Sequence, residues 1–330
     1  MVFLANSRTT RALAAVVIAS ALGLTACSSE EVDTSVESAV GLSVDAPRVT
    51  LQSSGTGTAE VLGYRDITEE SDTVQQEIEV EVSEGFDQTL VQADAVDVAA
   101  PAGGEVQALT LPLSGSTLAA EDADPDNEER AATRDVELIL GEPAITNLEL
   151  TEDVRSAEGF TLGWRAEDNG EVSTVRVAAP VDATDTGRAI AEQALFKLLS
   201  LPIIFPEEEL APGAVWTVDS RVTGEATLLQ TTTYTLASVD GDTVELDVEV
   251  QQRPALGALE LDGQEGAEEL TGQTLSVLNS NTTSEGSLTV DLTKPLPVDG
   301  SVAFTTRVIY GGADSDVRIV QDSTTALTFG

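Results

Sequence analysis

The sequence predicts a mainly β fold, made of antiparallel, hairpin-rich sheets with one principal amphipathic helix. Three observations lead to this fold class. Apolar and polar residues alternate along several segments, glycine-containing pairs that favour tight turns punctuate these segments, and one segment alone has its apolar residues at helical spacing. The sheets could form one curved sheet, a sandwich-like arrangement, or two lobes.

The amino-terminal half contains the first predicted strands. In residues 75–83, QQEIEVEVS, one isoleucine and two valines alternate with glutamates, which is typical of a strand with one buried face. Residues 159–177, GFTLGWRAEDNGEVSTVRV, predict a hairpin that turns at Asn169-Gly170, because Asn-Gly readily adopts the positive φ angles of a two-residue turn.

The carboxyl-terminal half predicts further antiparallel pairs. In TVELDVEVQQ, residues 243–252, apolar and polar side chains alternate strictly, so one face of this strand is expected in the core. We expect three hairpins, each with glycine at its turn. They are residues 231–252 turning at Asp240-Gly241, residues 273–292 turning near Glu285-Gly286, and residues 301–320 turning at Gly311-Gly312.

One segment predicts a helix over residues 186–201, TGRAIAEQALFKLLSL. Thr184 or Asp185 would cap its amino terminus, and Pro202 stands beyond its end. Its apolar face consists of Ile190, Ala194, Leu195, Leu198 and Leu199. The helix separates two strand-rich stretches of similar length. It therefore either divides the body, residues 48–330, into lobes at 48–183 and 202–330, or fills one curved sheet.

The first residues have the layout of an export signal. Arg8 and Arg11 precede an apolar run from Ala12 to Leu24, which is too short to span a bilayer. The motif Leu24-Thr25-Ala26-Cys27 resembles the bacterial lipoprotein cleavage box. That resemblance implies removal of residues 1–26 and acylation of Cys27, the only cysteine, with two or more acyl chains giving a stable anchor.

The alternative role for Cys27 is a buried thiol that happens to follow the signal. We favour acylation, because an exported lone cysteine has no disulfide partner. Residues 27–47 are then the acylated cysteine plus a flexible acidic tether, rich in serine, glutamate and aspartate. The protein is expected at the extracytoplasmic face of the cell membrane, attached to the membrane through its acyl chains.

The charge of the chain excludes several partners. The formal net charge is −42, and removal of residues 1–26 takes away two arginines and no acid, which leaves 14 basic against 58 acidic groups, or −44. Nucleic acids require a positive surface on the protein that binds them. No nucleic-acid partner is therefore expected, and an anionic membrane surface would repel the body itself.

The chain also lacks the side chains of common catalytic centres. It has no histidine, and acylation would block its one thiol, which excludes Ser-His-Asp and Cys-His nucleophiles and metal sites with histidine or cysteine ligands. Lys197 and Lys294 leave a Ser-Lys arrangement open, although Ser200 follows Lys197 where the known motif places serine first. A two-carboxylate hydrolase also stays open. No cofactor is predicted.

An acidic stretch near residue 125 gives the one weak metal candidate. Asp122, Asp124 and Asp126 alternate as the oxygen ligands at the start of a calcium loop do. However, Asn127 stands where that loop has glycine, and Thr133 stands where it has its last acid. We favour a solvated acidic loop over a calcium site.

Apolar residues around the predicted helix could be either core or a ligand pocket. The candidate wall of a lipid pocket consists of Ile190, Leu195, Leu198, Leu199, Ile203, Ile204 and Phe205. We favour packing of the helix onto a sheet for these residues. Trp164 and Trp216 could be ligand platforms, but each lies among strand residues, so we favour core positions for both.

The order of these segments resembles an uncharacterised family of bacterial, mainly actinobacterial, cell-envelope lipoproteins defined by a domain of unknown function. The resemblance covers residues 48–330. Its most specific elements are Pro206, Pro212-Gly213, Trp216 and the stretch from Asp291 to Pro297. It implies an envelope location and a β-rich body, and it implies no activity.

Three functions remain open. The first is a non-enzymatic binding or assembly module that meets another envelope protein. The second is a carrier of a lipid or other apolar ligand, held between the sheet and the helix, and this function requires a continuous apolar cavity of several hundred Å³ at least, on the scale of ligand pockets. The third is a carboxylate hydrolase, which requires two acids in one cleft.

Overall fold

A computed structural model describes residues 36–65, 67, 73–103, 106–122, 130–222, 227–256, 258–260, 274–312 and 315–330. By their contacts, residues 34–330 form one unit. The predicted signal, Leu24, Thr25, Ala26 and Cys27 lie outside the described residues.

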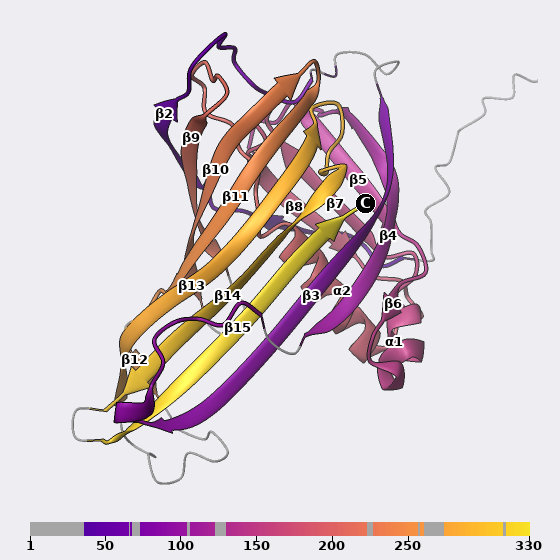
Figure 1. Cartoon of the computed structure of the whole chain (residues 1–330). Coiled ribbons are helices and arrows are strands. Elements are labelled where there is room, and N and C mark those ends of the chain that lie inside the picture. Colours follow the sequence, from indigo (N-terminus) through magenta and orange to yellow (C-terminus); the bar gives the residue numbers. More distant parts are fainter. Residues whose placement is uncertain are drawn as a thin grey trace, which may run out of the picture. The chain divides into compact units, whose positions relative to one another are not determined.

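In the described part of the chain the body is one antiparallel sheet (Figure 1), to which fifteen strands belong, so the prediction of a mainly β, antiparallel fold is confirmed. Thirteen strands follow the order β1-β8-β7-β5-β4-β3-β15-β14-β13-β11-β10-β9-β2, while β12 pairs with β13 and β6 with β4. The strands are β1 Val40–Ser43, β2 Arg48–Ser54, β3 Val74–Gln92, β4 Gln107–Ala119, β5 Arg134–Leu140, β6 Ala144–Ile145, β7 Thr161–Ala166, β8 Val172–Ala178, β9 Ala214–Val222, β10 Leu228–Asp240, β11 Thr243–Pro254, β12 Ala258–Glu260, β13 Thr274–Asp291, β14 Asp299–Gly311 and β15 Val317–Phe329.

The division into lobes 48–183 and 202–330 is wrong, because strands from both stretches belong to this one sheet. The junction is the pair β3–β15, which runs from Val80↔Phe329 to Gln92↔Val317. The last strand of the chain thus returns to the first long one. Alternation along each strand showed which face is buried, but it carries no information about a partner more than 200 residues away.

The sheet curls until its two edge strands approach each other. β1 is the first strand of the sheet order and β2 the last, yet residues 44–47 alone connect them. A fully extended connection of that length spans at most about 17 Å. The sheet therefore has a concave inner face that can enclose a core.

The body begins earlier than the predicted boundary at residue 48. β1 pairs with β8, and the backbone N–H of Glu37 donates to the carbonyl oxygen of Ala179 at 2.9 Å. The Glu37 carboxylate also forms an ion pair with Arg188 of the helix α2. The end of the predicted acidic tether is thus fixed to the sheet. The sequence did not predict this strand, because a strand of four residues is too short to show a clear alternation.

Two α-helices and two 3₁₀ turns are present among the described residues: α1 Thr151–Arg155, α2 Asp185–Leu198, η2 Ala93–Ala95 and η4 Leu148–Leu150. α2 is the predicted principal helix, and it lies against the concave face of the sheet (Figure 1). The Thr184 side chain caps it by accepting a hydrogen bond from the Gly187 N–H at 3.0 Å. The helix ends three residues before Leu201, because Pro202 disfavours a helical conformation at the residue preceding it.

Two of the predicted hairpin turns form where glycine supplies a positive φ angle. Gly170, with φ 95°, lies between β7 and β8 as predicted. In the β10–β11 hairpin, Asp240 pairs with Thr243, so the two-residue loop is Gly241-Asp242, with φ 64° at Gly241. The turn is therefore one residue later than the predicted Asp240-Gly241 pair.

The turn predicted near Glu285-Gly286 is wrong, because both residues lie inside the uninterrupted strand β13. Gly286 stands opposite Val302 of β14, and a Cβ at Gly286 would lie 2.9 Å from the Val302 Cα. Here glycine lets a neighbouring strand approach closely. By contrast, β14 ends at Gly311, in agreement with the turn predicted at Gly311-Gly312.

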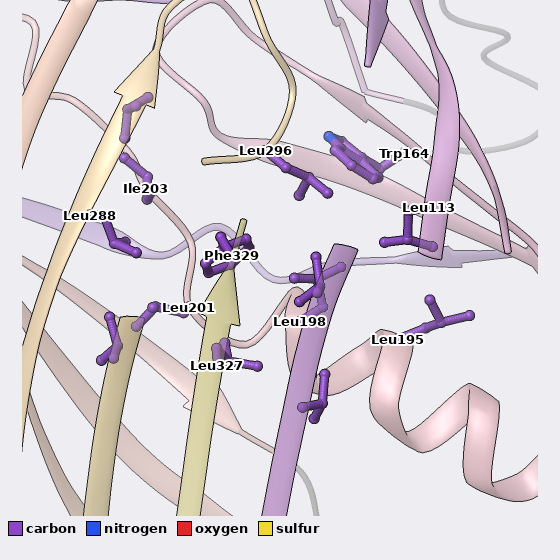
Figure 2. Packing of buried hydrophobic residues seen from close by; sticks show 14 of the residues in the cluster. Leu113, Trp164, Leu195, Leu198, Leu201, Ile203, Leu288, Leu296, Leu327 and Phe329 are labelled. Carbon is purple, nitrogen blue, oxygen red and sulfur yellow. The ribbon is translucent and has the colours of Figure 1, made fainter. Parts of the chain in front are cut away.

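The core lies between α2 and the concave face (Figure 2), where Leu195 and Leu198 of α2 gather with leucines of β4, β13 and β15. The strictly alternating strand β11 contributes Val244, Leu246 and two further valines to this core. Trp164 and Trp216 are both buried in it, so their predicted core positions are confirmed.

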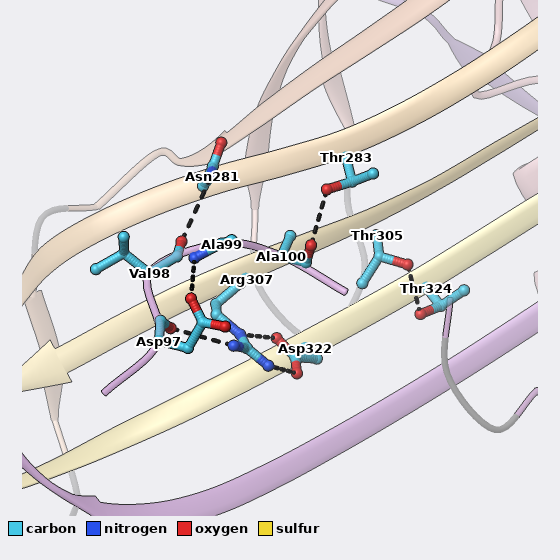
Figure 3. A network of polar contacts seen from close by, with 10 residues as sticks. All are labelled: Asp97, Val98, Ala99, Ala100, Asn281, Thr283, Thr305, Arg307, Asp322 and Thr324. Carbon is cyan, nitrogen blue, oxygen red and sulfur yellow. Dashed lines mark hydrogen bonds and ion pairs between the residues drawn. The ribbon is translucent and has the colours of Figure 1, made fainter. Parts of the chain in front are cut away.

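The opposite face of the sheet is partly covered by the segment that follows η2 (Figure 3). Arg307 of β14 forms a bidentate ion pair with Asp322 of β15 and also donates to the carbonyl oxygen of Asp97 at 3.1 Å. Thr283 of β13 donates to the carbonyl oxygen of Ala100 at 2.8 Å. These contacts fasten residues 97–100 to β13 and β14.

Candidate functional site

A small cavity of about 70 Å³ lies where α2 ends against the sheet. Its apolar wall comes from Leu198 and Leu199, from residues 201–203 that follow α2, from the 295–297 loop and from Phe329 at the end of β15. Arg134, Trp164 and Tyr64 bring its polar side chains, and the remaining described lining residues are Ala166, Gly170, Val172 and Leu288. These residues come from strands and loops far apart in the sequence, so only the curled sheet brings them together.

Arg134 is the only charged residue among the described residues of this lining. It begins β5 and shares the inward-facing row of that strand with Val136, Leu138 and Leu140, and the whole residue is only 3% exposed. Its Nε atom is buried without a hydrogen-bond partner. Among the described residues, no hydrogen bond from the Arg134 side chain and no ion pair of its guanidinium is found.

The Tyr64 ring is the main contact of this guanidinium. The Arg134 Cζ atom lies 4.4 Å from the ring centroid, which is a cation–π geometry. Burial lowers the pKa of Arg134, while the nearby Tyr64 and Asp168 oppose that shift. Burial likewise raises the pKa of Tyr64, and Arg134 opposes it. The guanidinium keeps its charge at neutral pH, since arginine does not deprotonate in proteins.

Two further donors of the lining lack a hydrogen-bond acceptor among the described residues: the Tyr64 hydroxyl and the Trp164 indole N–H. The comparable groups of the neighbouring core are paired. Trp216 Nε1 donates to the carbonyl oxygen of Ile204 at 2.9 Å, and the Tyr234 hydroxyl donates to that of Pro202 at 2.8 Å. Of the three donors, the Arg134 Nε atom alone is fully buried without a partner, whereas the Tyr64 hydroxyl and the Trp164 N–H reach accessible space.

The polar groups of this site are donors. The described residues of its lining offer one positive charge and two neutral donors within apolar walls, and no aspartate or glutamate is among them. A group that carries negative charge and accepts hydrogen bonds would satisfy all three donors. The lining offers no pair of acids that could perform two-carboxylate hydrolysis.

The predicted lipid-pocket wall divides into two groups. Leu198, Leu199 and Ile203 line the cavity. Leu195, Ile204 and Phe205 are buried in the core, and Ile190 packs against that core partly exposed. The cavity is several times smaller than the roughly 300–1,000 Å³ of pockets for drug-sized ligands, so this conformation has no room there for an acyl chain.

The other predicted site residues do not form a site in the described part of the chain. Asp122 is exposed, while Asp124 and Asp126 lie outside the described residues. No group of acids, histidines or cysteines that could hold a metal is found among the residues that the structure describes. The same part of the chain contains no helix long and apolar enough to cross a membrane.

A second cavity, of about 80 Å³, lies between the 97–103 segment and β13–β15. Its polar groups pair with each other: the Thr305 and Thr324 hydroxyls are 2.9 Å apart, and Thr283 bonds to the 97–100 backbone (Figure 3). It therefore presents no unmet hydrogen-bonding group comparable to Arg134.

The sequence did not lead us to Arg134 or Tyr64. A signal for Arg134 exists in RDVELIL, residues 134–140, where the arginine occupies the same strand face as a valine and two leucines. A charged residue at an inward position is expected to have a partner or a function. Tyr64 carries no such signal, because it lies in a loop.

Comparison with known proteins adds one match. A family of unknown function, DUF6263, matches residues 197–296, which run from the end of α2 through β9, β10, β11, β12 and β13 to the loop at Leu296. No curated protein matches the chain. The matched segment supplies much of the apolar cavity wall, whereas Arg134, Tyr64 and Trp164 lie outside it. This part of the chain is thus an uncharacterised domain.

Proposed function

We propose that this protein is a lipoprotein, anchored at the extracytoplasmic face of the cell membrane through acyl chains on Cys27, that acts as a non-enzymatic binding module of the envelope. The export signal, the cleavage-box motif and the resemblance to actinobacterial envelope lipoproteins support the location. The absence of histidine from the whole chain supports a non-enzymatic role.

The observation that carries the binding role is the Arg134 cavity. A buried guanidinium without a hydrogen-bond partner costs folding free energy. Such a group benefits the protein little unless a ligand binds to it. The cavity is therefore the proposed ligand-binding site. An envelope protein that presents an acceptor group to this site, or that docks on the acidic surface, is the proposed macromolecular partner.

A lipid carrier is the second candidate. Its support is the position of the cavity, which lies between α2 and the sheet where a carrier would hold its ligand. Its difficulty is the volume of about 70 Å³, so α2 or the 295–297 loop would have to move before an acyl chain could enter.

Mass spectrometry of the protein purified from its own membranes tests these proposals. The expected chain starts at Cys27 with the added mass of a diacylglycerol, and Cys27→Ser releases the protein from the membrane fraction. Native spectra are expected to show a bound small molecule or a stoichiometric protein. A bound lipid would favour the carrier. A chain that retains Met1 would refute the location, and a body without any ligand or partner would refute the binding role.

A further inference from the structure

The three unpaired donors of the cavity restrict the chemistry of its ligand. Guanidinium and indole groups only donate, a phenol hydroxyl can donate as well as accept, and the described residues of the lining include no carboxylate that could accept from a cationic ligand. A cation would also meet the positive charge of Arg134 in a site with little water. The ligand group must therefore be an acceptor, and an anion satisfies it best.

The charge of the site selects among anions. Among the described residues of the lining Arg134 alone is charged, so a monoanion is neutralised on binding. A phosphate dianion would leave one negative charge uncompensated near Asp168, whose charge already raises the pKa of Arg134. The body outside the cavity is strongly acidic and supplies no compensation. A planar carboxylate also matches the fork of the guanidinium with two parallel hydrogen bonds.

The volume of the site limits the size of this group. The cavity volume of about 70 Å³ is several times below the roughly 300–1,000 Å³ of pockets for drug-sized ligands. That space accommodates a carboxylate with a very short apolar substituent, which would contact Leu198, Leu296 and Phe329. It accommodates neither a sugar nor a long acyl chain.

We propose that the Arg134 cavity binds the carboxylate of a short monocarboxylic acid, with Arg134 as the anion-binding residue and Tyr64 and Trp164 as additional donors. This proposal rests on the proposed binding function and specifies its ligand class. Tyr64 also positions the guanidinium, since its ring lies under Arg134 and its backbone N–H donates to the carbonyl oxygen of Asp168 at 2.7 Å.

Thermal unfolding of the full-length lipoprotein in a non-ionic detergent tests the ligand class. Sodium propionate is expected to raise Tm in a saturable manner, because a ligand that binds the folded state alone stabilises it. Propionamide, which has the same shape without the charge, is expected to raise Tm much less at equal ionic strength. The same is expected of inorganic phosphate at about pH 8.5, where its dianion predominates. A long-chain fatty acid is expected to have no effect through this cavity.

Variants assign the effect to Arg134. Arg134→Met is expected to weaken propionate binding by about 10- to 100-fold, which is the effect of losing hydrogen bonds to a charged group. Arg134→Lys keeps the charge but loses the planar fork, and is expected to bind several times more weakly than the wild type. The matched control is Arg155→Met, an exposed arginine of α1 that is absent from the cavity lining.

The salt dependence of binding separates a buried site from surface cations. Because the body is highly acidic, it repels propionate at long range, and salt screens this repulsion more than it screens a buried contact. Affinity is therefore expected to rise from about 0.01 M to about 0.15 M ionic strength, where the Debye length falls from about 30 Å to about 8 Å. Surface cations would give the opposite trend.

The outcomes distinguish this proposal from the binding function on which it rests. The carboxylate proposal is overturned if the propionate effect persists in Arg134→Met. It is also overturned if propionate has no effect on the wild type, in which case water fills the cavity. If phosphate stabilises the protein more than propionate does, the carboxylate assignment is overturned while a binding function stands. If native mass spectra show a protein partner and no anion binds, the binding function again stands without this ligand.

Discussion

Replacing Arg134 by methionine is expected to stabilise the protein in the absence of ligand, which is unusual for a buried residue. The guanidinium is 97% removed from solvent, its Nε has no partner, and its main compensation is the Tyr64 ring at 4.4 Å. Burying an unpaired charge costs several kcal/mol, whereas a desolvated cation–π contact returns about 2 kcal/mol. Methionine fills similar space without a charge, so the free energy of unfolding should rise by about 1–3 kcal/mol.

Urea unfolding followed by tryptophan fluorescence measures this change, and the Tm should rise by about 2 °C per kcal/mol in a chain of this size. The matched control is Arg176→Met on β8, which is separated from β5 by β7 in the sheet. Arg176 forms a half-buried ion pair with Asp135, so its loss should lower the free energy of unfolding by about 1 kcal/mol. If Arg134→Met instead destabilises the protein by about 1 kcal/mol or more, Arg134 is held by stabilising contacts, and the argument for an energetically unsatisfied guanidinium fails.

Three more expectations concern the cap of α2, a hydrogen bond in the core and one carboxylate. Thr184→Ala removes the side-chain cap of α2 and should cost about 1 kcal/mol of unfolding free energy, with Thr184→Ser close to wild type. Trp216→Phe leaves the buried carbonyl oxygen of Ile204 without its donor and should cost about 1–3 kcal/mol, and a cost near zero would show that water replaces that donor. The pKa of Asp219 is lowered, mainly because Thr231 donates to it at 2.6 Å. The stability that this lowered pKa contributes is complete above about pH 4 and is lost as the pH falls through the lowered pKa of the folded state. Thr231→Val should therefore cost about 1 kcal/mol of unfolding free energy at pH 7 and little at pH 2. A cost that does not change with pH would exclude the Asp219 carboxylate as its origin.

Local sequence patterns predicted the strands well because alternation is a local property. Val244 and Leu246 face the core, as the pattern of β11 predicted, and Thr184, one of the two predicted cap residues, caps α2. The prediction failed at Gly286, because a glycine that permits close approach of a neighbouring strand looks the same in sequence as a glycine that makes a turn. The number of lobes could not be predicted either, since it depends on which strands pair.

The candidate site was beyond these patterns for the same reason. The wall residues Leu198, Leu199 and Ile203 were recognised as apolar neighbours of a helix, and three of the seven wall candidates do line the cavity. Arg134 lies in the same cavity as these wall residues only because β5 and β15 are both strands of the one curled sheet. A buried charge in a strand is visible in the sequence, but the absence of a partner for it is not.

By itself, the sequence determined the class of fold, the place and cap of the principal helix and the acidic character of the body, and it excluded histidine-dependent chemistry. These properties follow from composition and from the spacing of neighbouring residues. Only the tertiary structure decided that the strands form one sheet, that β1 and β2 lie on opposite edges, and that Arg134, Tyr64 and Trp164 meet in one cavity. The physical reason is that strand pairing joins residues far apart in the chain, and the cost of burying an unpaired charge depends on everything that surrounds it.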